Sequence, residues 1–223
     1  MLKKLKHATI IAHFSSRSKI LSKYNIDCST CLSRCDGVSK GVYIFQNDVN
    51  ISEHYEKLII RKINELGYIV ASKCELPGYP DIELTCEGKI IAYIEVKFQQ
   101  RTFMSVQKIL PQSDLMPSNT LALNQSDLLR YFEIGDEEQK PIYIVWGLSN
   151  RPCITKDKEV KFFYQNIDVL KEIYNKYKGK RRFRRASGKG DVVNGVHKGV
   201  VVNWHFSLNE FERFTIKDLI KNL

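Results

Sequence analysis

The sequence predicts an α/β fold in which a central mixed β-sheet is flanked by helices. Segments with helical apolar spacing alternate with short segments of strand character along the chain. One of these segments, residues 141–148, is almost wholly apolar, as expected of a strand buried on both faces. The chain has 223 residues, 43% of them hydrophobic and 27% charged, which suits one soluble domain with an extension. This composition excludes a wholly disordered chain, a collagen-like repeat and a membrane bundle.

The first predicted element is a helix over residues 50–67. Its apolar residues recur at helical spacing, Asn50 is a suitable N-cap, and Gly67 is suited to end the helix. A short strand over residues 68–72 and a turn at residues 78–80 follow.

A β-hairpin is predicted next, with strands at residues 81–86 and 89–98 on either side of Glu87 and Gly88. A three-residue loop would place Asp81 directly opposite Glu95, with both side chains on one face of the hairpin. A two-residue loop would make them diagonal neighbours instead.

The C-terminal half contains two further amphipathic helices and three strands. The Gly-rich and basic stretch at residues 178–191 is predicted to be an internal loop. The helices are expected at residues 124–135 and 167–177, the strands at 141–148, 160–165 and 196–206, and a last helical stretch at 215–223.

The net charge of +10 is distributed unevenly along the chain. Residues 1–40 carry a charge of +6, residues 41–170 carry −4, residues 171–190 carry +8 and residues 191–223 are neutral. Cations gathered in this way indicate a polyanionic partner, because each phosphate that they neutralise releases condensed counterions. A solvated basic loop or a targeting signal is the alternative. The expected nucleic-acid contacts are Lys178, Lys180, Arg181, Arg182, Arg184, Arg185 and Lys189.

The hairpin carries the candidate catalytic residues. Strand side chains alternate between faces, so Glu95 and Lys97 share one face. Two carboxylates held close together repel each other unless a cation lies between them, and Mg²⁺ prefers oxygen ligands. Asp81 and Glu95 are therefore candidate ligands for a catalytic Mg²⁺, and Lys97 would lie beside the ion. A surface pair of charges on a half-exposed strand is the alternative.

The segments YPDIEL and IEVK, with thirteen residues between Asp81 and Glu95, resemble the PD-(D/E)xK nuclease superfamily. That superfamily includes type II restriction enzymes and Holliday junction resolvases. The resemblance covers roughly residues 50–150 and implies a restriction-endonuclease-like core. It also implies that Asp81 and Glu95 bind the catalytic ion and that Lys97 assists the attacking water. Glu56, or alternatively Glu53, would be the further acidic residue contributed by the preceding helix.

The cysteines Cys28, Cys31 and Cys35 have the spacing of metal ligands in a small N-terminal knuckle. A structural metal there, zinc ahead of an iron–sulfur cluster, is weighed against free thiols. A fourth ligand would come from Cys74, Cys153, His7 or His13.

Several other residues are expected to be structural. His197 and His205 flank an apolar strand and are expected to be packed or exposed rather than catalytic. Trp146 and Trp204 are expected in the core, whereas Phe183 could stack on a base.

These observations divide the chain into an N-terminal segment (residues 1–45), a nuclease core (46–170) and a basic C-terminal extension that contributes to DNA binding (171–223). We expect a Mg²⁺-dependent endonuclease acting on DNA, of the type II restriction kind. A Holliday junction resolvase or repair nuclease, and a non-catalytic nucleic-acid-binding module, are the alternatives. We further expect a homodimer. The sequence has no apolar stretch long enough to span a bilayer, so a cytoplasmic protein of prokaryotic or phage origin is expected.

Overall fold

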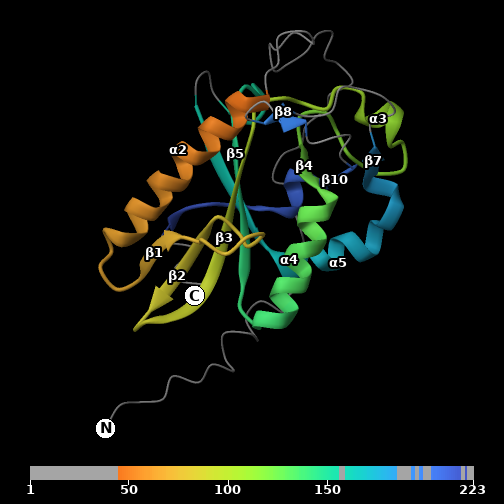
Figure 1. Ribbon diagram of the computed structural model, residues 1–223. Coiled ribbons are helices and arrows are strands. Elements are labelled where there is room, and N and C mark those ends of the chain that lie inside the picture. Colours follow the sequence, from red (N-terminus) through yellow and green to blue (C-terminus); the bar gives the residue numbers. More distant parts are fainter. Residues whose placement is uncertain are drawn as a thin grey trace.

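A six-stranded mixed β-sheet lies at the centre of the computed structural model, which describes residues 45–155, 159–184, 192–193, 196–197, 202–216 and 219 (Figure 1). The strand order is β1-β2-β3-β5-β6-β11. β3 and β5 run parallel, and the other neighbours in this sheet run antiparallel. The predicted mixed sheet is thus confirmed. Its strands are β1 (Val70–Lys73), β2 (Ile82–Cys86), β3 (Lys89–Gln99), β5 (Ile142–Leu148), β6 (Lys161–Asn166) and β11 (Glu212–Arg213).

Helices cover both faces of this sheet, as predicted (Figure 1). The helix α2 (Phe45–Asn64) packs on one face, where Ile59 and Ile63 meet alternate residues of β2 and β3. The helices α4 (Gln125–Glu138) and α5 (Ile167–Tyr177) pack on the other. Asn124 and Asn166 cap these two helices, because their side chains accept hydrogen bonds from the first-turn N–H groups.

A second, three-stranded antiparallel sheet has the order β4-β10-β7. Its strands are β4 (Thr120–Asn124), β10 (Val202–Ser207) and β7 (Arg182–Arg184). Trp204 and Phe206 of β10 pack in the same core as Trp146 of β5, so both tryptophans are buried as predicted. Part of the segment assigned to the C-terminal extension therefore contributes to the core of the fold.

The remaining elements are short. The helix α3 (Val106–Ile109) lies in the connection from β3 to β4, and the strands β8 (Val192–Val193) and β9 (Val196–His197) pair with each other. Two 3₁₀ turns, η1 (Lys178–Arg181) and η2 (Leu208–Glu210), lead into β7 and β11.

The helix and late-strand boundaries differ from those predicted. Asn50 lies inside α2, which begins at Phe45, so it is not the N-cap. The apolar spacing does not mark the start of a helix whose first turns are largely polar. The late strand predicted over residues 196–206 is instead two strands, β9 and β10. β4 and α3 were not predicted.

The hairpin of β2 and β3 has the two-residue loop Glu87-Gly88, and both residues have positive φ, as a type I′ turn requires. A β-bulge leaves Ile91 without a partner on β2. The bulge shifts the register by one residue, so Ile82 lies opposite Ile94. Continuing that register by one residue places Asp81 opposite Glu95. The arrangement expected for a three-residue loop is therefore reached by a two-residue loop plus a bulge.

Residues 1–44 lie outside the described residues, and with them the metal ligands predicted at Cys28, Cys31, Cys35, His7 and His13. The same holds for the nucleic-acid contacts predicted at Arg185 and Lys189. Within the described part of the chain, no helix has the length and apolar character needed to cross a bilayer.

Candidate active site

Asp81 and Glu95 meet at the point where β2 begins. The N–H of Asp81 donates a hydrogen bond to Oε2 of Glu95 over 3.2 Å. Oδ2 of Asp81 in turn accepts a hydrogen bond from the N–H of Val96 over 2.8 Å. The two carboxylates are therefore cross-linked through the backbone, and their separation depends on the register of the hairpin.

This geometry follows from the unequal lengths of the two strands. β2 begins at Ile82, whereas β3 continues to Gln99, so the edge of β3 beyond Ile94 has no strand partner in β2. Val96 would then leave a backbone N–H unpaired on that edge, and the carboxylate of Asp81 satisfies it. The carbonyl of Asp81 accepts from the N–H of Cys74, which joins the loop before β2 to its start.

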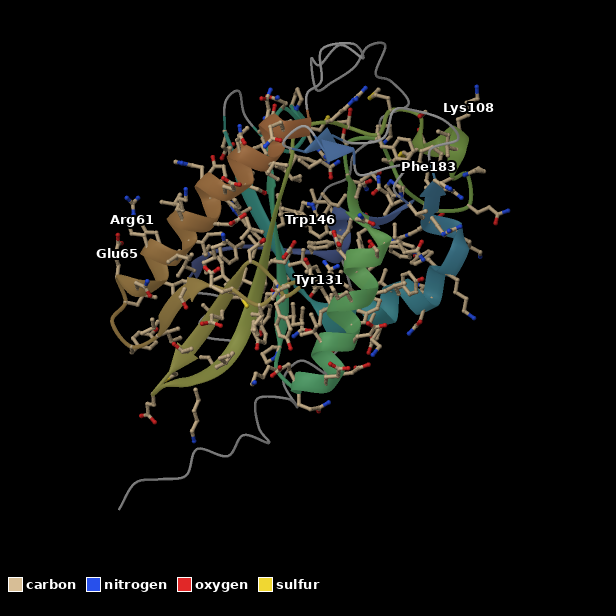
Figure 2. The ribbon with its side chains drawn as sticks, viewed as in Figure 1. Arg61, Glu65, Lys108, Tyr131, Trp146 and Phe183 are labelled. Carbon is tan, nitrogen blue, oxygen red and sulfur yellow. The ribbon has the colours of Figure 1, made fainter. Side chains whose placement is uncertain are left out.

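Lys97 and Tyr131 are the side-chain partners of Glu95. Nζ of Lys97 forms an ion pair with Oε1 of Glu95. The hydroxyl of Tyr131, on α4, forms a hydrogen bond with the same carboxylate. Glu95 is 2% exposed, so its charge is buried, and these partners offset the cost of removing it from water. Figure 2 shows Tyr131 on the side of α4 that faces the sheet.

The pKa values of the site reflect its crowded negative charge. Burial, and then the charge of Glu95, raise the pKa of Asp81 to about 8, although Lys97 opposes the shift. Partial burial of Lys97 disfavours its charge, but the groups around it, Glu95 foremost, together outweigh this and raise the pKa of Lys97. Burial and Glu95 likewise raise the pKa of Tyr131, so its hydroxyl stays protonated and can donate to Glu95. One ammonium group therefore does not neutralise both carboxylates.

Glu56 lies near the same group of charges, on α2. Burial raises the pKa of Glu56, and Glu95 and Glu53 raise it further, whereas Lys97 and Lys73 lower it. Glu56 is half-buried and Glu53 is exposed. The pKa of Glu56 thus responds to the charges of both Glu95 and Lys97. Its catalytic role stays a prediction.

The donor set fits a divalent metal ion of the Mg²⁺ kind. Asp81 and Glu95 supply carboxylate oxygens, which hard cations prefer. A cation between them would also relieve the repulsion that raises the pKa of Asp81. Among the described residues, no group of three or more His, Cys, Asp and Glu side chains is placed to hold a metal.

The cations of the basic segment divide into exposed and buried ones. Exposed side chains are Lys178, Lys180, Arg182 and Arg184, of which Arg182 also donates to Gln125 over 2.8 Å. These four remain predicted contacts to nucleic acid.

Arg181 is instead buried, with 2% of its surface exposed. Its guanidinium forms two 2.8 Å hydrogen bonds with the carboxylate of Glu210 and stacks on Tyr177 at 3.5 Å from the ring centroid. Arg181 therefore holds the chain together, which corrects the expectation that it contacts nucleic acid. An arginine in a basic run does not reveal from sequence that its partner is a glutamate 29 residues away.

Other candidates have structural positions. His205 is buried beside Phe103, and its Nδ1 lies 3.1 Å from the carbonyl of Arg181, so it is packed as predicted. Phe183 packs on Phe103 with ring centroids 5.5 Å apart. Cys74 is buried in the core and Cys153 is exposed, both as free thiols. The side chain of His197 lies outside the described residues.

Tyr131 was missed in the sequence because it looks like any apolar residue of an amphipathic helix. Arg130 beside it was missed as well; it donates to the carbonyl of Gly78 over 2.7 Å and to Asp127 over 2.8 Å. Arg130 thereby links α4 to the loop that leads to Asp81. Both residues lie in an element separated in sequence from the motif, and no local signal marks them.

No protein-family model matches this chain, and no curated protein matches it in sequence. Among solved structures, it is similar to Hjc, a Holliday junction resolvase from the archaeal hyperthermophile Archaeoglobus fulgidus. The TM-score is 0.37 and the identity 11%, over 71% of this chain and 85% of that one. At this low level of similarity, we infer the function from the site itself.

Proposed function

We propose that this chain is a divalent-metal-dependent nuclease that hydrolyses phosphodiester bonds in DNA. The observation that supports this most directly is the pair Asp81 and Glu95, cross-linked through the backbone, with Lys97 against Glu95. The pair concentrates negative charge that a divalent cation would balance, at the edge of β3 that β2 leaves without a strand partner. The exposed cations on and before β7 supply the complementary attraction for a phosphate backbone.

Each residue has a distinct task in this reaction. A bound divalent ion would stabilise charge on the phosphoryl oxygens and favour ionisation of a water molecule. Asp81 and Glu95 hold the ion, and the hydrogen bonds to the backbone keep their oxygens in place. Lys97, whose side chain is 32% exposed, orients the attacking water or stabilises the charge that develops on the phosphate. The hydroxyl of Tyr131, on α4, keeps the carboxylate of Glu95 oriented.

Cleavage of supercoiled plasmid in Mg²⁺ at low salt, compared with EDTA, tests this proposal. Asp81→Asn and Lys97→Met should each reduce the rate about 100-fold or more, the loss typical of removing a group that stabilises charge in the transition state. Glu83→Gln is the matched control, because Glu83 lies two residues after Asp81, on the same face, but bonds to Ser72 over 3.1 Å. It should cleave at the wild-type rate.

The preferred DNA substrate would distinguish a restriction-type nuclease from a junction resolvase. Discrete plasmid fragments would indicate the restriction-type enzyme expected from the sequence, and selective cleavage of a four-way junction would indicate a resolvase. DNA binding without cutting on plasmid, junction or single strands would contradict the nuclease proposal and favour a binding module. Cleavage that survives EDTA or both substitutions would contradict the assigned site.

A homodimer is expected if the enzyme cuts both strands, because two-fold protein symmetry matches the two-fold geometry of the duplex. Light scattering of the free protein and of its DNA complex would measure the mass. A monomer in both states would contradict this expectation.

A further inference from the structure

A cleft of about 430 Å³ lies between the N-terminal half of α2 and the C-terminal ends of β3 and β5. These elements meet in the upper part of the view in Figure 1. None of the residues that line it is Lys, Arg, Asp or Glu. The cleft is thus chemically different from the acidic site, although β3 and α2 contribute to both.

One wall of the cleft is aromatic. The rings of Tyr55 and Phe98 are nearly parallel, with an interplanar angle of 17° and centroids 5.6 Å apart. Gly147 of β5 makes this possible, because a Cβ atom at that position would lie 2.7 Å from the ring of Phe98. The wall is therefore built into the sheet.

The rim of the cleft carries neutral polar groups beside the imidazole of His54. Asn50, Gln100 and Asn150 contribute carboxamides, and Ser149 contributes a hydroxyl. The amide of Asn150 donates to Oε1 of Gln100 over 3.1 Å, which orients both side chains. Carboxamides both donate and accept hydrogen bonds, as the edges of nucleobases do. An aromatic wall with such a rim suits a flat, uncharged, hydrogen-bonding ligand better than a phosphate.

The cleft lies just beyond the acidic site along β3 but on the opposite face of the sheet, because Phe98 packs against Tyr55 of α2 whereas Glu95 meets Tyr131 of α4. Lys97 is followed directly by Phe98, and at about 3.3 Å per residue Gln100 lies about 10 Å beyond Lys97. On α2, the hydroxyl of Ser52 donates to the carbonyl of Val96 over 3.3 Å, which ties the helix to the strand directly after Glu95. The edge of β3 beyond Ile94 has no strand partner in β2, so a nucleic-acid strand with one phosphate at Lys97 could pass around this edge and bring a nearby nucleotide to the cleft.

We propose that this cleft binds one unpaired base of the DNA strand that is cut. The proposal rests on the proposed nuclease function for the presence of that strand. A base can enter only if it leaves the helical stack, so the site favours DNA that is single-stranded, branched or locally opened. Stacking on the aromatic wall and hydrogen bonds to the carboxamides would then select the position of cleavage relative to the unpaired nucleotide.

The test places the fluorescent base 2-aminopurine at successive unpaired positions of an oligonucleotide, bound in Ca²⁺ in place of Mg²⁺. Stacking on an aromatic ring should quench the fluorescence at one position. An abasic nucleotide at that position should weaken binding to the wild type about 5-fold or more. Gln100→Ala should weaken binding of the intact oligonucleotide about 3- to 10-fold and reduce its sensitivity to the abasic nucleotide.

Asn175→Ala is the matched control, because it removes an exposed carboxamide from α5, on the other side of the sheet. It should bind like the wild type. Quenching that is equal at all positions, or equal effects of Gln100→Ala and Asn175→Ala, would overturn the proposal. The proposal would also be overturned if free nucleosides saturated the cleft and the position of a base within a strand had no effect on its binding.

The two proposals fail separately. Absence of Mg²⁺-dependent cleavage would refute the nuclease function, while the Ca²⁺ binding assay would still report on the base. The base-binding cleft alone would be refuted if Gln100→Ala cut at the wild-type position and rate. The quenching of 2-aminopurine fluorescence would also have to be unchanged in this variant.

Discussion

Glu95 shows how a single buried charge organises the candidate site. Its carboxylate receives the N–H of Asp81, the ammonium of Lys97 and the hydroxyl of Tyr131. Each partner comes from a different part of the chain. Since a buried carboxylate without partners would be very costly, the fold around Glu95 must be complete before the site exists.

Tyr131→Phe should raise the Mg²⁺ concentration needed for half-maximal cleavage about tenfold or more, the usual effect of removing a residue that orients a metal ligand. The ring remains, so its packing against the sheet is kept, and only the hydrogen bond to Glu95 is removed. Titration of cleavage rate with Mg²⁺ measures the shift. Tyr174→Phe, which removes a hydroxyl bonded to Gln125 over 3.0 Å, is the control. Identical Mg²⁺ titrations for the two variants would show that Tyr131 does not orient Glu95.

Because of His205, we expect the free energy of unfolding to fall in mild acid. Burial, and to a smaller extent the charge of Arg181, lower the pKa of His205 to about 4, although its bond to the carbonyl of Arg181 opposes the shift. The unfolded chain takes up this proton near pH 6.5, so the contribution is present in full above that pH and decreases towards pH 4. The loss amounts to at most about 3 kcal/mol.

Urea unfolding at pH 7, 6 and 5 measures this effect. The free energy of unfolding should fall more steeply for the wild type than for His205→Gln, which keeps a hydrogen-bond donor and does not titrate. Parallel pH dependences would mean that His205 takes up its proton in the folded protein as readily as in the unfolded chain.

At the level of elements, the hairpin shows how a local irregularity serves the site. A regular two-residue hairpin would place Asp81 opposite Ile94, with its side chain on the other face from that of Glu95, and the bulge at Ile91 corrects the register. The segment of η1 and β7 has a similar division of tasks. Arg181 points inward to Glu210, while its neighbours Arg182 and Arg184 are exposed.

Arg181→Met should lower the free energy of unfolding by about 3 to 5 kcal/mol, because it leaves Glu210 buried without its cation. Arg184→Ala should change it by less than about 0.5 kcal/mol and weaken DNA binding instead. Urea unfolding and DNA affinity, measured on both variants, separate the two roles.

The double variant Arg181→Met with Glu210→Leu should recover part of the stability that Arg181→Met removes, since no unpaired charge remains. Equal stability of Arg181→Met and the wild type would place Arg181 back among the candidates for binding DNA.

At the scale of the molecule, the acidic site and the exposed cations come from different sheets. The hairpin belongs to the six-stranded sheet, and β7 belongs to the three-stranded one. The shared core around Trp146, Trp204 and Phe206 joins the two sheets. A substrate held by both must therefore span the boundary between them.

The salt dependence of DNA binding tests this whole-molecule arrangement. Replacing Lys178, Lys180, Arg182 and Arg184 with Gln should reduce the slope of log affinity against log salt by about 0.9 for each duplex phosphate that the protein no longer neutralises. The control replaces Arg61 and Lys62, which pair with Glu65 on α2. Figure 2 shows Arg61 and Phe183 on opposite sides of the molecule. Equal slopes for both variants would show that the four cations do not bind DNA.

The sequence left the pairing of Asp81 with Glu95 open between two loop lengths, and the bulge decided it. By itself the sequence determined the mixed α/β architecture and the two amphipathic helices of the C-terminal half. These features depend on local spacing, and apolar periodicity and turn residues record them directly. The cysteine knuckle and the roles of the catalytic residues stay predictions.

The tertiary structure alone decided which side chains complete the site. Tyr131 partners Glu95, Arg181 is buried, and the cleft beside Phe98 exists because Gly147 leaves room for the ring. Each of these facts depends on packing between residues far apart in the chain. The apolar periodicity of the sequence cannot predict them. It indicates which face of a helix or strand a side chain occupies, but not which residues pack against that face.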